Sequence, residues 1–282
     1  MKTRIIAAAV LLPILLVVVL FLPTVVTAVL FGIMAAIAAW ELLWGTGYVK
    51  HPRLVGYSCL FAFLIALWSN LSGVYVWSNL SGAYVWMLAG VLVMICLMFM
   101  EIMISNMKLR FDKVVACLAA GLLIPFLFTA IVRLHSAFNG RFYILIPFVI
   151  AFISDSGAYF AGRFFGKHKL APTISPKKTI EGAVGGILGA IVGMLIYGLV
   201  LQLAFQFHVN YLAAVVYGLL GSLAGIFGDL CFSCIKRQTG IKDYSNLIPG
   251  HGGILDRFDS NIIIAPLVEL LMLLWPVAVR LW

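Results

Sequence analysis

Residues 182–206 read GAVGGILGAIVGMLIYGLVLQLAFQ, 25 positions without a single Asp, Glu, Lys, Arg or His. A helix needs roughly 20 apolar residues to cross about 30 Å of hydrocarbon, so this stretch predicts a transmembrane helix. The rest of the chain has the same character, because 64% of its 282 residues are apolar and only 10% are charged. Such a composition excludes a soluble globular protein. The sequence therefore predicts an all-α, polytopic integral membrane protein.

Further stretches outside residues 182–206 are also apolar enough to be spans. The first of them could pass for a signal peptide, but Pro23 leads directly into the second without a small-residue cleavage site. We therefore expect the first span to be retained. About nine transmembrane helices are predicted, near residues 5–22, 24–44, 54–71, 83–104, 114–133, 143–162, 182–206, 211–231 and 261–280.

The basic residues predict the orientation of these spans. If the N-terminus is cytoplasmic and the spans alternate, 16 of the 19 Lys and Arg residues fall on the cytoplasmic side. The other three are Arg133, Arg141 and Arg280. Because Lys and Arg concentrate in cytoplasmic loops, this split supports the predicted helix count. It also places two polar loops, 163–181 and 232–259, on the cytoplasmic face, where we expect the active site.

Polar residues are unevenly distributed along the chain. Residues 1–140 contain few beyond loop charges and predict a transmembrane scaffold. Residues 141–282 contain nearly all the candidate functional residues and predict a catalytic region that includes both polar loops. Glu41 and Glu101 lie near predicted cytoplasmic helix ends, where an interfacial carboxylate is ordinary, and we do not place them in the site.

Two carboxylates, Asp155 and Asp229, fall in or at the end of predicted spans, where insertion costs roughly 2.5–3.5 kcal/mol each. Asp229 closes the eighth span. If that helix continues, Asp229, Ser233 and Lys236 follow at i, i+4 and i+7 and share one face. The spacing predicts one edge of a polar pocket. The alternative is that Asp229 only pairs with Lys236 or with a helix end.

Residues 233–259, SCIKRQTGIKDYSNLIPGHGGILDRFD, contain seven Asp, Lys or Arg residues and one His. If a helix begins at Ile254, Asp256 and Asp259 project from neighbouring positions on its first turn. Carboxylates without a His or Cys cluster are hard oxygen ligands that suit Mg²⁺. Asp229 and Asp256 are the leading predicted ligands, and Asp259 is a third. The alternatives are an ordinary glycine turn and, for Asp259, a charge at a helix N-terminus.

The loop 163–181 contains five Lys or Arg residues, one His and two prolines, Pro172 and Pro176. The prolines argue against a helix. The bases could clamp a triphosphate, with Lys177 and Lys178 leading into a helix whose N-terminal amides add to an anion site. The pattern G-x-x-x-x-G-K-[ST] is absent from the chain, so this loop is not predicted to be a P-loop.

Taken together, these motifs resemble the signature of the phosphatidate cytidylyltransferases, also called CDP-diacylglycerol synthases. The resemblance is specific over about residues 155–260 and only hydropathic over the N-terminal half. Residues 155–163 and 175–182 also resemble family segments. The pattern is Ser233-x-Ile235-Lys236-Arg237, then Lys242-Asp243-x-Ser245, then Ile248-Pro249-x-His251-Gly252-Gly253-Ile254-x-Asp256-Arg257-Phe258-Asp259.

The resemblance implies transfer of CMP from CTP to phosphatidic acid, giving CDP-diacylglycerol and pyrophosphate. It implies that Ser233 contacts a substrate phosphate, and that Asp259 ligates a second cation or orients Lys236. Asp229, Ser233, Lys236, Arg237, Asp256 and Asp259 are the predicted catalytic residues. Asp155, Arg163, Ser175, Lys177, Lys178, Thr179, Glu181, Lys242, Asp243, His251, Gly252, Gly253 and Arg257 are predicted to bind substrate.

Phosphatidic acid is expected to enter laterally from the inner leaflet and CTP from the cytosol, in a bacterial inner membrane. No nucleic-acid partner is expected, and the resemblance makes a homodimer plausible. Two alternatives stay open. A CTP-dependent lipid or isoprenoid kinase would release a nucleoside diphosphate, and a transporter would be expected to show an inverted repeat and a midplane site.

Overall fold

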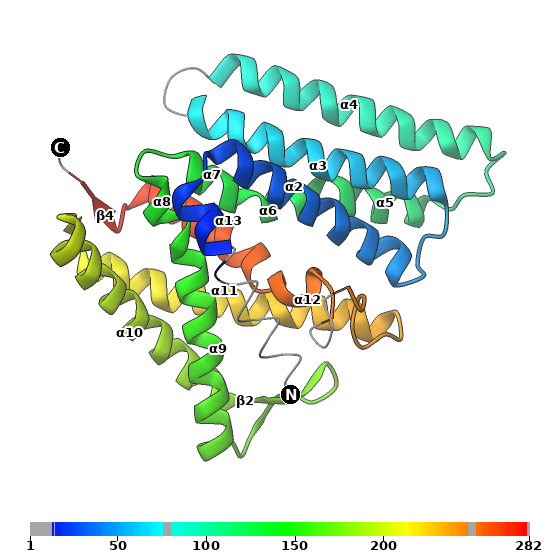
Figure 1. Ribbon diagram of the computed structural model, residues 1–282. Coiled ribbons are helices and arrows are strands. Elements are labelled where there is room, and N and C mark those ends of the chain that lie inside the picture. The colour runs from blue at the N-terminus through cyan, green and yellow to red at the C-terminus, as the bar shows by residue number, and fades with distance from the viewer. Residues whose placement is uncertain (1–12, 14, 76–79, 248–251, 281–282) are drawn as a thin grey trace. The chain divides into compact units, whose positions relative to one another are not determined.

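The computed structural model describes residues 13, 15–75, 80–247 and 252–280, and this part of the chain is predominantly helical (Figure 1). It divides into two compact units. The first contains the described residues up to Arg141 together with Gln238–Phe258, and the second contains Phe142–Arg237 and the residues from Asp259 onward.

The first unit is built around α2 and α3. Gly32 of α2 allows close approach to α3, because a Cβ added there would lie 2.8 Å from the Phe63 ring. Phe31 of α2 contacts the rings of Phe128 and Phe258 at centroid distances of 5.4 and 6.3 Å, which joins α2 to α6 and α12. The elements are α2 (Thr24–Trp40), the π-helical turn η1 (Glu41–Gly45), α3 (Pro52–Tyr75), α4 (Leu80–Ile104), α5 (Phe111–Leu118), the π-helical turn η2 (Ala119–Leu123), α6 (Ile124–Phe128), α7 (Ala130–Ser136) and α12 (Leu255–Phe258), and α8 (Gly140–Tyr143) crosses the unit boundary.

The second unit is built on the long helices α9, α10 and α11. Antiparallel pairing joins β1 to β2, with Lys169 opposite Thr179, and β3 to β4, with His208 opposite Val279. The β1–β2 hairpin separates α9 from α10 along the chain. The elements are α9 (Leu145–Phe165), β1 (Lys169–Ala171), β2 (Ser175–Thr179), α10 (Ile180–Phe205), β3 (His208–Val209), α11 (Tyr211–Gln238), α13 (Asn261–Leu274) and β4 (Ala278–Val279).

Seven helices of the described chain are long and apolar enough to cross a membrane, and they correspond to seven predicted spans. The protein is therefore a polytopic, helical membrane protein. Half of the predicted span 5–22 lies outside the described residues, and residues 15–21 are helical. The total of nine spans and the orientation stay predictions. The seven helices are Thr24–Gly45, Pro52–Ser72, Val85–Ile104, Phe111–Ser136, Gly140–Phe165, Ile180–Phe205 and Tyr211–Gln238.

The last predicted span, 261–280, extends too far. Helix α13 ends at Leu274, because Trp275 precedes Pro276 and a residue before proline is pushed out of the α region. Trp275 has φ −154° and ψ 81°. Residues 278 and 279 instead pair with β3. At about 1.5 Å per residue, the 14 residues of α13 extend about 21 Å.

The two polar loops have different structures. Loop 163–181 contains the β1–β2 hairpin, so the prediction that its prolines exclude a helix is confirmed for residues 166–179. The segment 232–259 is divided, because residues up to 237 continue α11 in the second unit while Gln238–Phe258 belong to the first. The predicted division of labour between residues 1–140 and 141–282 stays a prediction.

Candidate active site

Helix α11 carries the first polar group of the site. It runs without interruption from Tyr211 to Gln238, so the prediction that the helix continues past residue 231 is confirmed. The Ser233 hydroxyl donates a hydrogen bond to Oδ1 of Asp229 over 3.0 Å. Ser233 and Lys236 are both buried, with 7% and 9% of their surfaces exposed. Asp229, Ser233 and Lys236 thus occupy the helix face that their spacing predicts.

The β1–β2 hairpin approaches this face through two basic residues. Nζ of Lys178, near the end of β2, lies 2.5 Å from Oδ2 of Asp229. Nε of Arg237 donates to the carbonyl oxygen of Ile174 over 3.2 Å. Asp229 therefore holds Ser233 with one oxygen and Lys178 with the other. The structure thus pairs Asp229 with Lys178, and the alternative pairing of Asp229 with Lys236 or with a helix end stays a prediction.

Asp259 lies between α12 and α13 and interacts with the same region. Burial raises its pKa to about 7, and repulsion by Asp229 and Asp155 adds to the rise. The Ser260 N–H, which donates to Oδ1 of Asp259 over 2.8 Å, and the positive charge of Lys236 act in the opposite direction. Within the second unit, Asp155 and Asp229 therefore lie close enough to Asp259 to raise its pKa.

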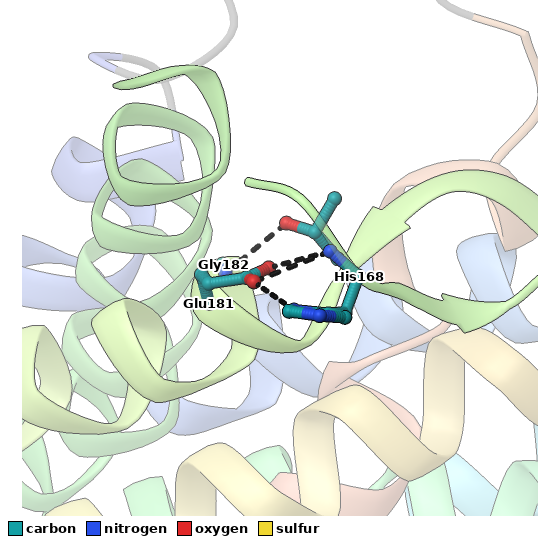
Figure 2. Close-up of polar contacts among 4 residues, drawn as sticks. His168, Glu181 and Gly182 are labelled. Atoms are coloured by element: carbon teal, nitrogen blue, oxygen red, sulfur yellow. Dashed lines mark hydrogen bonds and ion pairs between the residues drawn. The ribbon is translucent and has the colours of Figure 1, made fainter. Parts of the chain in front are cut away.

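The base of the hairpin is fixed to the first turn of α10. Oγ1 of Thr179 accepts a hydrogen bond from the Gly182 N–H over 3.1 Å and caps the helix. Figure 2 shows the adjacent pair, in which Nδ1 of His168 lies 2.7 Å from Oε1 of Glu181. The His168 N–H also faces both Glu181 oxygens at 3.2 Å. These contacts orient the hairpin, and the predicted substrate roles of Thr179 and Glu181 stay predictions.

Asp256 belongs to the first unit and closes a tight turn. Its Oδ2 accepts hydrogen bonds from the Tyr244 N–H over 2.8 Å and the Gly253 N–H over 3.0 Å. Gly252 has a φ of +82°, which a residue with a side chain adopts only with strain. The prediction that Asp256 and Asp259 share the first turn of the last helix is wrong. Helix α12 ends at Phe258 and α13 begins at Asn261, so the chain leaves the helix at Asp259.

Sequence reasoning missed Glu41, which is fully buried at the start of η1. Its Oε1 accepts hydrogen bonds from the Ser245 hydroxyl at 2.6 Å and the Ile254 N–H at 3.0 Å, and its Oε2 accepts from the Leu255 N–H at 2.9 Å. The available signal was a carboxylate in an apolar segment, which needs partners when buried. The interfacial position expected for Glu41 stays a prediction, whereas its partners in residues 245, 254 and 255 were not predicted.

The remaining predicted residues have more open surroundings. Arg163 donates through Nη1 to the hydroxyl of Tyr159 over 2.9 Å. Ser175 lies opposite Ala171 in the hairpin. His251 lies outside the described residues. Arg163, Lys177, Lys242, Asp243 and Arg257 are exposed.

A divalent cation needs several hard oxygen donors close together. Across residues 13, 15–75, 80–247 and 252–280, no three His, Cys, Asp or Glu side chains form a group that could hold a metal ion. The carboxylates that act on Asp259 are nevertheless hard oxygen donors, and their mutual repulsion would be relieved by a cation. Mg²⁺ commonly uses one or two carboxylates plus waters and substrate phosphates. Asp155, Asp229 and Asp259 are donors of the kind that Mg²⁺ takes, and a magnesium site here stays a prediction.

The chain is similar to known proteins over most of its length. The chain matches the model of the cytidylyltransferase family over residues 2–275. The phosphatidate cytidylyltransferase of Staphylococcus epidermidis is 35% identical over 244 residues, which are 86% of this chain and 89% of that protein. That of Staphylococcus haemolyticus is 33% identical over 258 residues, 90% of this chain and 94% of its own. That of Staphylococcus aureus (strain COL) is 42% identical over 135 residues, about half of each chain at 48% and 50%.

Proposed function

The chain belongs to the cytidylyltransferase family, and from that premise we propose how its residues divide the work of the reaction. The protein is a nucleotidyltransferase that moves CMP from CTP to phosphatidic acid, giving CDP-diacylglycerol and pyrophosphate for phospholipid synthesis. Two observations together support this function. The family model matches nearly the whole chain, and relatives named phosphatidate cytidylyltransferase are 33–35% identical over 86–90% of the chain.

The reaction brings two anions together. The phosphomonoester of phosphatidic acid has a second pKa of about 6, by analogy with phosphorylated side chains, and is largely ionised near neutral pH. It needs no strong general base to attack the α-phosphorus of CTP. What it needs is fixed geometry and positive charge near the oxygens on which charge develops. Catalysis by this protein is therefore mainly positioning and electrostatics, as in other phosphoryl transfers.

The α11 face supplies the central groups. Asp229 holds the Lys178 ammonium at 2.5 Å and the Ser233 hydroxyl at 3.0 Å, so a hydroxyl and a cation are fixed side by side. Ser233 contacts a substrate phosphate, and Lys236 and Arg237 offset charge on the attacking and leaving oxygens. Asp229, Asp256 and Asp259 would hold Mg²⁺, with a second cation in addition, and the bound metal would supply Lewis-acid chemistry at the α-phosphoryl group.

The two loops supply the rest of the substrate contacts. On the hairpin side, the bases of the loop bind the triphosphate, and the substrate-binding residues are Asp155, Arg163, Ser175, Lys177, Lys178, Thr179 and Glu181. On the side of the 232–259 segment, Lys242, Asp243, His251, Gly252, Gly253 and Arg257 complete the site. The exposed positions of Arg163, Lys177, Lys242 and Arg257 support these roles, because an incoming anion can reach their charges.

The protein has nine spans, a cytoplasmic N-terminus and a site open to the cytosol and the inner leaflet of a bacterial inner membrane, and it forms a homodimer. The 16 to 3 distribution of basic residues and the bacterial source of the relatives support the topology and location.

The test is the identity of the products. Purified protein in detergent with Mg²⁺ is given CTP with and without phosphatidic acid, and pyrophosphate, CDP and CDP-diacylglycerol are measured. We expect pyrophosphate and CDP-diacylglycerol in equal amounts, dependent on phosphatidic acid and abolished by a chelator. Release of CDP would identify a kinase. Turnover that survives the chelator would overturn the assigned role of Mg²⁺.

A further inference from the structure

Glu41 is the buried carboxylate whose contacts no proposed role yet explains. It lies 204 positions before Ser245 and 214 before Leu255, yet its two oxygens accept hydrogen bonds from Ser245, Ile254 and Leu255. None of its surface is exposed. A buried carboxylate is expensive unless such donors satisfy it. The contact therefore depends on η1 lying against Ser245, Ile254 and Leu255.

The backbone around Glu41 is shaped for the same contact. A Cβ added to Gly253 would lie 2.2 Å from Oε1 of Glu41, so only glycine fits between the carboxylate and the turn. A Cβ added to Gly45, at the other end of η1, would lie 2.7 Å from the Tyr244 carbonyl oxygen. Short π-helical segments such as η1 occur frequently at functional sites. The two ends of η1 thus lie close to Gly253 and Tyr244, the two residues whose N–H groups donate to Asp256.

Asp256 is held by the same turn from the inside. Its Oδ2 accepts hydrogen bonds from the N–H groups of Tyr244 and Gly253. The next two N–H groups, those of Ile254 and Leu255, donate to Glu41. Two carboxylates therefore share the consecutive amides of residues 253–255. Displacing either one shifts the backbone that orients the other.

We propose that Glu41 is a positioning residue for the reaction, which acts by clamping the 252–256 turn and so fixes the orientation of Asp256. This inference rests on the proposed role of Asp256 as a metal ligand. Glu41 does not touch substrate. Its contribution is geometric, and a displacement of about 1 Å at a reacting centre can lower a rate about 100-fold.

The test replaces Glu41 with Gln. The amide has the shape of the carboxylate but only one oxygen, so either Leu255 or the pair Ser245 and Ile254 loses its acceptor and faces an NH₂ group. The matched control is Glu101→Gln on α4. Glu101 is also a buried carboxylate of the first unit, 5% exposed, and contacts the Tyr57 hydroxyl at 3.2 Å and Arg53 at 3.7 Å.

Two measurements decide the result. We expect Glu41→Gln to lower kcat at least about tenfold while KM for phosphatidic acid stays within about twofold, and Glu101→Gln to leave both within about twofold. Hydrogen exchange followed by mass spectrometry should show amides 252–258 and Tyr244 exchanging about tenfold faster in Glu41→Gln only, since hydrogen bonds to the charged carboxylate protect this turn and some of them are lost.

Three outcomes would overturn the inference: an unchanged kcat, a reduced kcat with unchanged exchange, or equal losses in the Glu101→Gln control. If Glu41→Gln is not recovered folded, Glu41→Asp and Glu101→Asp are compared by the same criteria. Failure of the proposed function is visible separately. It would remove turnover from the wild-type protein or leave Asp256→Asn fully active, whatever Glu41 does.

Discussion

Asp229 has partners on two elements, because Lys178 comes from the hairpin and Ser233 from its own helix, α11. Asp229 and Lys178 are about one third and one quarter exposed, so part of their attraction is screened by solvent and the pair contributes little to stability. Its importance is expected in the reaction, where oriented charge lowers the barrier more than it stabilises the fold.

Replacing Asp229 with Asn keeps the shape and the acceptor for Ser233 but removes the charge opposite Lys178. We expect kcat for pyrophosphate release to fall at least about 100-fold, with little change in the melting temperature. The control is Asp112→Asn, since Asp112 is a partly exposed carboxylate in a surface pair with Arg110 at 3.2 Å. Activity in Asp229→Asn within tenfold of wild type would count against the assignment.

Asp259 predicts how stability depends on pH in the absence of metal. Its pKa is raised from 3.8 to about 7 by burial and by the charges of Asp229 and Asp155, against the opposing charge of Lys236. The folded protein therefore binds the proton more tightly than the unfolded chain between about pH 4 and 7. Stability from this group is fully present below about pH 4 and is lost as the pH rises through 7.

With a chelator present, we expect the melting temperature of the wild-type protein to fall by several degrees relative to Asp259→Asn as the pH is raised from 5 to 8. The asparagine carries no charge at either end of this range, so it lacks the repulsion by Asp229 and Asp155. Thermal denaturation of both proteins at four pH values makes the comparison. Parallel curves for the two proteins would show that the Asp259 carboxyl does not titrate in this window.

At the scale of the element, α9 and α10 lie side by side in the second unit (Figure 1). A Cβ added to Gly157 of α9 would lie 2.6 Å from the Gly185 carbonyl oxygen, and one added to Gly185 would lie 2.2 Å from Cβ of Ala161. Small residues allow helix backbones in a membrane to approach closely. The two helices hold both ends of the hairpin, so their spacing sets where Lys178 can reach.

Gly185→Ala tests this packing. The added methyl group has no space, so the helices must separate, and we expect a loss of about 1–3 kcal/mol in the free energy of unfolding. Gly90→Ala on α4 is the matched control, because a Cβ there meets nothing within 4 Å. Melting temperatures of the two variants in the same detergent provide the readout. Similar melting temperatures for both would show that the α9–α10 contact is not limited by the size of residue 185.

At the scale of the whole molecule, the proposed topology places alternate loops on opposite sides of the membrane. Lys108, between α4 and α5, is predicted to be cytoplasmic, whereas Arg141 is predicted to face outward. Both side chains are exposed. In a variant without the five native cysteines, we expect Arg141→Cys to react with an impermeant maleimide on intact cells and Lys108→Cys to react only after permeabilisation. The reverse pattern would invert the proposed orientation.

Local patterns were sufficient for much of the molecule. The apolar spans, the continuous polar face of α11 and the absence of a helix between β1 and β2 follow from hydropathy, helical periodicity and proline chemistry, each of which acts over a few residues. The end of α13 was within reach of the same reasoning, since Pro276 was visible in the sequence. The signature from Ser233 to Asp259 was enough to indicate the family.

Partners distant in the sequence could not be predicted in this way. Asp229 pairs with Lys178, and Glu41 accepts hydrogen bonds from Ser245, Ile254 and Leu255, because packing brings these distant groups together. The sequence shows that a carboxylate in an apolar segment needs hydrogen-bond donors. It does not show which donors folding brings close to that carboxylate. The sequence by itself therefore determined that this is a helical membrane enzyme of the cytidylyltransferase family. Only the tertiary structure decided which charges hold one another, because that choice depends on packing between segments up to 214 positions apart.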